Sequence, residues 1–394
     1  MTTFNFSLLA GETGPLVMGG TPDMLRVPTH GHKAILSAQD QVLSGTKIAT
    51  ATQPGMGDLH SPLAGVIEEI ELDAMLIRVT GDDRANAPAT PSNSGEPLKE
   101  WLRENGVNVG FMGRAATLII NAVPPEPGIS SCEPLLRDYR KVVELGLDTV
   151  QKIVSPSRMH LVTAKGNQAN AFPNCTVLNV PPVYPNGLDP LVIRKVTGKE
   201  VLLGARPEET VILSVRDLYS IGRIMETGRP LTETIMTIGS QNHLVKVGTP
   251  VGYLVQQAGA TVQPGDKVVL GGMLRGLSSL NLKQGVDKDT TGLFIMRSGE
   301  GLQPTDNFCL GCGECEKHCP ANIMPGLISR CAEFKHFTRA ENYHIHSCIE
   351  CGLCGYYCKA QRPLLQYIRL AKYELALLST PDPVEQDITA GGAA

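Results

Sequence analysis

Two cysteine runs near the end of the chain have the residue type and spacing of a metal-cluster site. "CLGCGECEKHCP" begins at Cys309 and "CIECGLCGYYCK" begins at Cys348, and both follow the pattern Cys-x-x-Cys-x-x-Cys-x-x-x-Cys. Three thiolates at steps of three residues can surround one iron–sulfur cluster, and the fourth lies one helical turn further on. Zinc is the alternative, but zinc needs only four ligands from two separated Cys-x-x-Cys pairs. The doubled pattern therefore favours iron–sulfur clusters over zinc knuckles.

The same spacing resembles that of two-cluster bacterial ferredoxins, in which the fourth cysteine of each run binds the other cluster. The resemblance implies two [4Fe–4S] clusters that lie close enough for electrons to hop between them. One departure is Lys359, which adds a positive charge where the first run has Pro320. The ligands implied for the first cluster are Cys309, Cys312, Cys315 and Cys358. The ligands implied for the second cluster are Cys348, Cys351, Cys354 and Cys319.

The rest of the composition is that of an ordinary soluble chain. The 394 residues carry a net charge of −4 and no long basic run, which argues against nucleic acid as the main partner. We see no secretory signal and no apolar run long enough to span a bilayer. The remaining cysteines, Cys132, Cys175 and Cys331, are scattered, so we expect a reducing compartment without a disulfide framework.

Apolar and glycine patterns predict helices around the cysteine runs. The segment between the runs is predicted to be helical, with Cys331 as a small buried residue and not a ninth ligand. His336, His344 and His346 form a candidate metal patch, but no carboxylates accompany them at ligand spacing, so we expect solvent-exposed side chains. After Pro363 an apolar stripe predicts a helix that docks on the cluster module, and residues 379–394 are predicted to be a flexible tail.

Strand and helix signals alternate in the upstream three quarters of the chain. "HSPLAGVIEEIE" predicts a strand, "LKEWLRENG" a helix ended by Gly106, and "ATLIINAV" and "MHLVTA" two strands of a parallel α/β layer. A single amphipathic helix is predicted for "CEPLLRDYRKVVELGLDTVQKIV". Between residue 208 and about residue 292 we expect small strands, one helix and tight glycine turns.

Several of these segments resemble one family, the C subunit of the membrane-bound, ion-translocating Rnf complex. They include "VLSGTKIA", "LIINAVPPEPGISS", "YPNGLDPLVIRKVTGKE", "NHLVKVGTPVGYLV", "LGGMLRG" and the cysteine runs followed by "PLLQYIRLAKYE". The resemblance implies an α+β multidomain fold that also resembles the NADH-binding flavoprotein subunit of respiratory complex I. The domains it implies are a barrel-sandwich hybrid (1–84), a linker (85–97), a Rossmann-like α/β domain (98–207), a β-grasp-like (SLBB) domain (208–295), a two-cluster ferredoxin-type helical module (296–378) and the tail (379–394).

The flavin- and NADH-binding motif of that family is altered in this chain. The family's glycine-rich loop is reduced to "VGFMGRAA", in which Gly110 and Gly113 remain among bulky residues. The acidic turn after the next strand keeps Asn121 and Glu126 but has apolar residues in place of its acidic pair. We therefore predict that NADH binding is lost. A residual FMN site on those four residues, with Arg114 at the phosphate, is the alternative.

The sequence thus predicts an electron-transfer subunit that relays electrons through two [4Fe–4S] clusters. By the resemblance it is expected to sit peripherally on the cytoplasmic side of the cell membrane, within a complex of other subunits. Its electron donor would be a ferredoxin, a cytochrome or NADH. Two other hypotheses remain: a soluble flavin-dependent reductase of the cobalamin-reductase type, and a non-catalytic adaptor subunit. The adaptor is disfavoured because exposed thiolates without a redox role are prone to oxidation.

Overall fold

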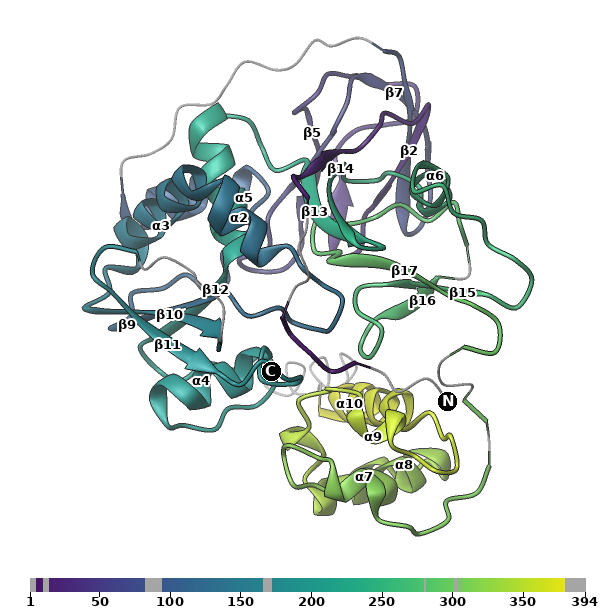
Figure 1. Ribbon diagram of the computed structural model, residues 1–394. Helices are drawn as coiled ribbons and strands as arrows, with labels where there is room; N and C mark the ends of the chain where they lie inside the picture. The colour runs from purple at the N-terminus through teal and green to yellow at the C-terminus, as the bar shows by residue number, and fades with distance from the viewer. Residues whose placement is uncertain are drawn as a thin grey trace, which may run out of the picture. The chain divides into compact units, whose positions relative to one another are not determined.

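The computed structural model describes residues 5–9, 14–81, 94–165, 172–279, 281–300, 304–305 and 307–379. The chain divides into two compact units (Figure 1). Unit 1 comprises residues 1–200 and 206–298, and unit 2 comprises residues 201–205 and 299–394. The expected linker and the expected tail fall largely outside the described residues, which leave out 82–93 and 380–394.

The N-terminal part of unit 1 contains two small antiparallel sheets with an apolar core. The first has the strand order β2-β8-β7-β4 and the second β3-β5-β6. Leu25, Ile48, Ile67 and Ile77 belong to the shared core and are fully buried, and β7 confirms the strand predicted in this region. The strands are β2 (Met24–Pro28), β3 (His32–Ala34), β4 (Gln41–Val42), β5 (Lys47–Ala51), β6 (Leu59–His60), β7 (Gly65–Ile70) and β8 (Ala74–Val79).

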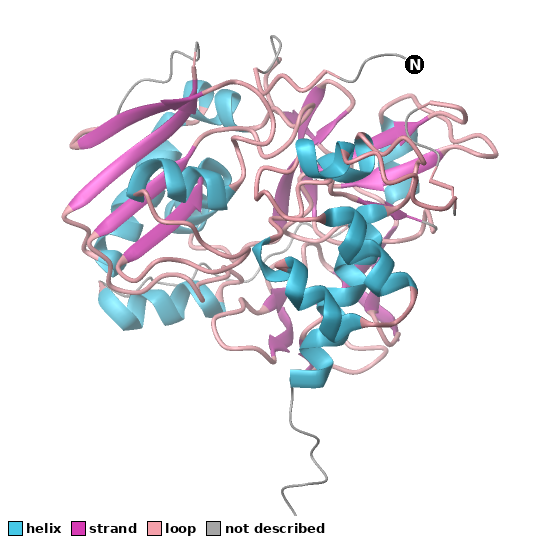
Figure 2. Cartoon of the chain, turned by 90° about the horizontal axis from the view of Figure 1, so that it is seen from below, coloured by secondary structure: helices cyan, strands magenta, loops and turns pink. Residues whose placement is uncertain are grey.

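The predicted α/β layer is a four-stranded parallel sheet with the order β11-β10-β9-β12 (the long arrows at the left of Figure 2). In chain order this is 3-2-1-4, the order with which doubly wound folds begin. The strands are β9 (Thr117–Asn121), β10 (Arg158–Ala164), β11 (Cys175–Val180) and β12 (Thr210–Ser214). The helices are α1 (Gly95–Glu104), α2 (Cys132–Asp138), α3 (Arg140–Val154), α4 (Asp189–Thr197) and α5 (Val215–Thr227).

Two features of this layer differ from the prediction. The helix predicted for residues 132–154 is broken at Tyr139, whose φ of −120° and ψ of 26° end α2 and precede α3. The Tyr139 ring packs edge-on against Tyr219, 5.5 Å between centroids, so tertiary packing favours the break although the apolar pattern continues through it. In addition, β12 and α5 fall within the segment expected as a β-grasp-like domain, yet β12 pairs with β9 in the parallel sheet. Two helices, α5 and α6 (Val251–Gln257), therefore lie between residues 208 and 292, where one was expected.

Helices α3 and α5 cross with their backbones almost in contact. A Cβ on Gly146 would lie 1.9 Å from the Leu218 carbonyl oxygen, and one on Gly222 would lie 1.9 Å from that of Val142. Only glycine at both positions permits this approach, which buries Val143, Leu147 and Leu218 in the core that also contains Trp101. Close packing of this layer thus depends on two residues without side chains.

The last part of unit 1 is a six-stranded sheet with the order β1-β14-β13-β17-β15-β16. Met236, Val251, Leu254 and Val268 form the core between this sheet and helix α6. The N-terminal strand β1 pairs in parallel with β14, so a segment expected in the first domain completes this sheet. Its elements are β1 (Val17–Met18), β13 (Glu233–Ile238), β14 (Gln241–Lys246), α6 (Val251–Gln257), β15 (Lys267–Leu270), β16 (Leu277–Ser279) and β17 (Gly292–Met296).

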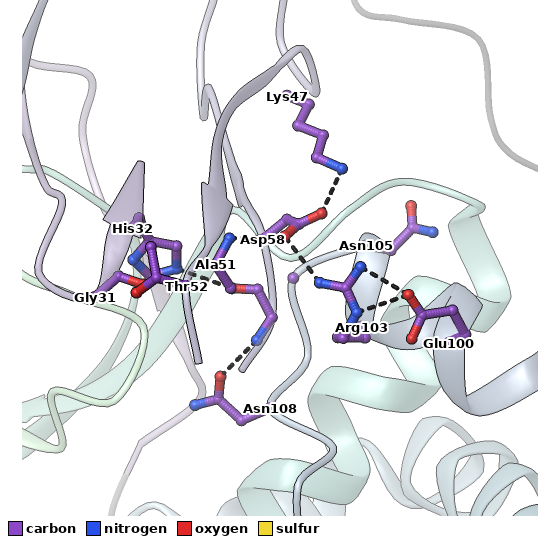
Figure 3. Close-up of polar contacts among 12 residues, drawn as sticks. Gly31, His32, Lys47, Ala51, Thr52, Asp58, Glu100, Arg103, Asn105 and Asn108 are labelled. Atoms are coloured by element: carbon purple, nitrogen blue, oxygen red, sulfur yellow. Dashed lines mark hydrogen bonds and ion pairs between the residues drawn. The ribbon is translucent and has the colours of Figure 1, made fainter. Parts of the chain in front are cut away.

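A buried carboxylate joins the N-terminal sheets to α1 (Figure 3). Asp58 has a fully buried side chain that forms ion pairs with Lys47 and, at 3.0 Å, with Arg103, and accepts the Ala51 amide at 3.0 Å. Burial alone would raise the pKa of Asp58, but the bonds from Lys47 and Ala51 and the charge of Arg103 together lower it. The paired carboxylate therefore stabilises the folded state above the pKa of an ordinary aspartate, and that contribution is lost in acid.

Unit 2 is helical; Cys348 and Cys354 lie in its apolar core, and Cys315, Cys319 and Cys358 pack against it. Helix α10 buries Leu364, Leu365, Ile368 and Ala371, which confirms the predicted docking helix. None of the helices in the described ranges is both long and apolar enough to cross a bilayer. The elements are α7 (Glu314–Lys317), α8 (Pro325–Glu333), η1 (Phe337–Tyr343), η2 (Ile345–Ser347), α9 (Leu353–Tyr356) and α10 (Leu364–Ser379).

Gly222→Ala is expected to destabilise unit 1 by about 1–3 kcal/mol, because the added methyl group forces α3 and α5 apart. Urea unfolding followed by the fluorescence of Trp101, the single tryptophan, measures this change in the layer where the substitution lies. The matched control is Gly113→Ala, since a Cβ there meets nothing within 4 Å. Equal stability of both variants would contradict the backbone-contact interpretation.

His60 is expected to make stability depend on pH between about 6.5 and 4. Burial lowers the pKa of His60 to about 4, and although Asp58 opposes this, Lys47 and Lys288 reinforce it. The unfolded chain then binds more protons, so stability is complete above pH 6.5 and falls by roughly 3 kcal/mol as the pH drops to 4. His60→Gln should flatten this part of the urea-midpoint profile while keeping the loss below pH 4 that Asp58 causes. An unchanged slope between pH 6.5 and 4 would contradict the assignment.

Candidate functional site

The first three cysteines of the first run line one pocket together with the last cysteine of the second run. Gly326 at the start of α8 and Arg362 just before α10 complete part of its wall. The pocket is partly open to solvent. Four thiols around one cavity are the donor set that a [4Fe–4S] cluster requires. The cysteines of this first pocket are Cys309, Cys312, Cys315 and Cys358.

The other four cysteines influence one another electrostatically and lie mostly in the core of unit 2. Burial raises the pKa of Cys351 to about 12, and the charges of Cys348 and Cys319 add to the rise. Burial likewise raises the pKa of Cys354, with contributions from the same neighbours. Burial therefore disfavours the free thiolate form of Cys351 and Cys354. The members of this second group are Cys319, Cys348, Cys351 and Cys354.

Backbone amides point at several of these sulfurs. The Glu350 amide lies 3.4 Å from the Cys348 sulfur, and the Arg362 amide lies 3.4 Å from the Cys358 sulfur. Gly313 and Gly352 occupy equivalent places in the two runs, with φ values of 73° and 76°, where they precede α7 and α9. Glycine is needed there because other residues are strained in this left-handed conformation. The two runs therefore form the same loop twice.

The two groups differ in exposure. Cys309 and Cys312 are exposed, whereas Cys348, Cys351 and Cys354 are buried. Next to the exposed pair, Phe308 and Leu310 are 84% and 69% exposed. Solvent and oxidants therefore reach the first pocket more easily than the second.

Positive charges on α10 are used inside unit 2. Glu350 pairs at 2.9 Å with both Arg369 and Lys372, and Lys372 also donates to the Cys348 carbonyl at 2.8 Å. Burial would raise the pKa of Glu350, but these two cations lower it overall. The basic residues of this helix thus hold the ligand loop of the second group.

The candidate histidine patch is exposed, as predicted. His336, His344 and His346 are all exposed, and His346 lies 3.4 Å from the Glu341 carboxylate. Among the described residues, no three His, Cys, Asp or Glu side chains are placed to hold a single metal ion. Cys331 is buried in the apolar core of unit 2, which confirms the prediction of a small buried residue at this position.

The four candidate flavin residues do not converge on one site. Asn121 ends β9, where the amide nitrogen donates to the Gly187 carbonyl and to Asp189, both at 3.0 Å. Its amide oxygen accepts the Val123 amide at 3.1 Å. In doubly wound sheets, ligands bind beside the carboxyl ends of the first and fourth strands, the place that Asn121 occupies. Its side chain is here engaged by the chain itself.

Glu126 is also engaged within unit 1. Its buried carboxylate accepts the amides of Leu274 and Arg275 at 2.8 and 3.1 Å, and a Cβ on Gly272 would lie 2.1 Å from its carboxyl carbon. It therefore ties the turn after β9 to the "GGMLRG" loop. No local pattern in the chain indicates that this acidic residue faces backbone amides.

The altered glycine loop packs on the N-terminal sheets. The Gly55 carbonyl accepts the amides of Val109 and Gly110 at 2.6 and 3.0 Å. Met112 is buried in the core, while the exposed ring of Phe111 lies 4.0 Å from the Arg206 guanidinium. Gly113 and Arg114 are exposed, so Arg114 lies at the surface. These residues do not fit a flavin-phosphate cradle.

Comparison with known proteins points to one family of subunits, although no family model matches the chain. The chain is 28% identical to the C subunit of the ion-translocating oxidoreductase complex of Buchnera aphidicola, over 65% of this chain and 58% of the relative. It is 26% identical to the C subunit of the proton-translocating ferredoxin:NAD(+) oxidoreductase complex of Clostridium ljungdahlii, over 91% of this chain and 90% of the relative. The chain is a homologue of these C subunits.

Other relatives of the same name are longer than the matched region. The C subunit of the ion-translocating oxidoreductase complex of Vibrio cholerae is 26% identical, and the match spans 83% of this chain but 49% of the relative. Among solved structures, the chain is similar to a chain of an NAD+-reducing [NiFe]-hydrogenase in the H2-reduced state, with a TM-score of 0.43. That match has 12% identity and covers 73% of this chain and 64% of the other.

Oxygen is expected to attack the first cysteine group before the second when the chain carries iron, because Cys309 and Cys312 are exposed. Brief exposure to air, quenched with iodoacetamide under anaerobic conditions, should label these two cysteines first, as mapped by peptide mass spectrometry. Cys351 and Cys354 should be labelled several-fold more slowly. Simultaneous labelling of both groups would contradict the difference in exposure.

Proposed function

We propose that this homologue of C subunits is an iron–sulfur electron-transfer subunit of an ion-translocating oxidoreductase complex. In this proposal two [4Fe–4S] clusters are bound by crossed ligands, Cys358 joining the first run and Cys319 joining the second. The observation that carries it is the sharing of one pocket by cysteines from both runs. The mutual influence of Cys319 and the cysteines of the second run supports the reciprocal half.

When bound, such clusters accept and release one electron at a time, within a range of potentials of roughly −700 to +450 mV. The chain's own contribution is to hold the thiolates, direct amides of the ligand loops at sulfur, and keep water from the second group. Hydrogen bonds to sulfur and solvent exposure both shift cluster potentials. The two cysteine groups differ in solvent exposure, so we expect unequal potentials and a preferred direction for the electron.

The surroundings of the chain are inferred from its relatives. We propose that it binds other subunits of a membrane complex peripherally, on the cytoplasmic side, and receives electrons from a ferredoxin, a cytochrome or NADH. We also propose that the two N-terminal sheets, the parallel layer, the six-stranded sheet and unit 2 correspond to the barrel-sandwich, Rossmann-like, β-grasp-like and ferredoxin-type domains.

The residues present do not fit a flavin site, because Gly110, Asn121 and Glu126 form contacts within unit 1. Loss of NADH and FMN binding thus stays a prediction. The flavin-dependent reductase of the cobalamin-reductase type remains the second candidate, and bound flavin in the purified protein would favour it. The adaptor hypothesis is tested by the same preparation, since it requires no iron.

Single-ligand variants are expected to fall into two classes. After anaerobic purification, iron, sulfide and flavin are quantified together, and dithionite-reduced samples are compared by electron paramagnetic resonance. Cys309→Ala and Cys358→Ala should lose the same signal and about half of the iron, because both remove a ligand from one cluster. Cys354→Ala and Cys319→Ala should lose the other signal.

Cys331→Ala is the matched control, because Cys331 is buried in the same core but lines neither group. It should retain both signals and all of the iron. If Cys319→Ala resembled Cys309→Ala, the crossed arrangement would be wrong. A wild-type chain that bound zinc, or no metal, would refute the electron-transfer proposal.

A further inference from the structure

Arg362 is a buried cation in unit 2, and one of its three side-chain nitrogens has no partner among the described residues. Its side chain is 1% exposed, and one terminal nitrogen donates to the Asn307 carbonyl at 2.6 Å. The other terminal nitrogen pairs with Glu333 at 2.7 Å, and the guanidinium carbon lies 5.3 Å from the Tyr367 ring. Its Nε is buried without a hydrogen-bond partner among the described residues. A buried unpaired donor is costly, so this Nε–H requires an acceptor.

The acceptor should lie in the first cysteine pocket. Arg362 lines that pocket beside the four cysteines, and its own amide already lies 3.4 Å from the Cys358 sulfur. On another part of the wall, Gly326 of α8 directs its amide at the Cys315 sulfur. A Cβ at Gly326 would lie 3.3 Å from that sulfur, which leaves little room for any other residue. Donors from two elements thus face the same space.

The second half of the repeat has no matching cation. Arg362 comes four residues after Cys358, and the residue four after Cys319 is Ile323. Ile323 is also buried, at 3% exposure. The same cysteine pattern is therefore followed by a guanidinium beside the first cysteine group and by an aliphatic side chain beside the second.

We propose that Arg362 tunes the cluster held by Cys309, Cys312, Cys315 and Cys358 by donating its Nε–H to cluster sulfur and stabilising the reduced state with its charge. Reduction adds one electron from the complex's redox partner, and no bond is formed or broken. The added negative charge interacts favourably with a buried guanidinium, so Arg362 raises the potential of this cluster. Glu333 opposes the effect by partly compensating the guanidinium charge. The inference rests on the proposed function, because it requires a cluster in the pocket.

Redox titration of the full chain, monitored by electron paramagnetic resonance, tests this role. The relevant signal is the one that Cys309→Ala lacks. Arg362→Gln should lower the equilibrium constant for reduction of that cluster at least tenfold, which corresponds to a downward shift of its midpoint potential by about 59 mV for one electron. The midpoint potential of the other cluster should not change. Arg362→Lys keeps the positive charge but lacks the planar guanidinium with its Nε–H donor. Its midpoint potential should therefore lie between those of the wild type and Arg362→Gln. Glu333→Gln should shift the same midpoint upward.

The control is Arg330→Gln, an exposed arginine of α8, which should move neither midpoint. If Arg362 had only a structural role, Arg362→Gln would change the iron content, and Arg362→Gln and Glu333→Gln would not shift the midpoint potential in opposite directions. Unchanged midpoints in iron-replete Arg362→Gln would overturn the inference while leaving the proposed function intact. If Arg362→Gln loses its iron, Glu333→Gln decides, and a midpoint that does not rise overturns the inference. Absence of iron from the wild type would instead refute the proposed function.

Discussion

The arrangement of unit 2 depends on one cysteine of each run lying beside the first three cysteines of the other run. Cys358 belongs to the second run but lines the pocket of the first, and Cys319 of the first run interacts electrostatically with Cys351 and Cys354 of the second. Neither site can be complete unless both halves fold together. The apolar face of α10, packed in the core with Cys331 and Ile345, holds them in that arrangement. Cysteines of both runs and the apolar core of this unit are thus formed by the same elements.

Unit 1 shows how residues that resemble a cofactor motif can instead stabilise contacts between sheets. Asn121 holds the turn before α4, Glu126 binds the loop after β15, and Gly110 lies against Gly55. Each contact uses a hydrogen bond or a close approach that a bound ligand would otherwise need. Retention of these residue types therefore does not require retention of the ligand.

The repeat in unit 2 creates two sites that are similar in ligands and different in surroundings. One is exposed and faces the guanidinium of Arg362, and the other is buried beside an ion-paired Glu350. Equivalent loops set the sulfur positions, while non-equivalent neighbours set the electrostatics. Under the proposed function, such a division would give an electron two steps of unequal energy within unit 2.

The sequence by itself determined the ligand ladder, the docking helix and the parallel strands, because these follow from fixed spacings and from apolar periodicity. It also predicted the exposed histidines and the buried Cys331. Tertiary structure alone decided the break at Tyr139, the pairing of β1 with β14 and of β12 with β9, and the engagement of Asn121 and Glu126. These features arise between residues far apart in the chain, where local pattern carries no information. The buried Arg362 belongs to the same class, since its role depends on a pocket built from both cysteine runs.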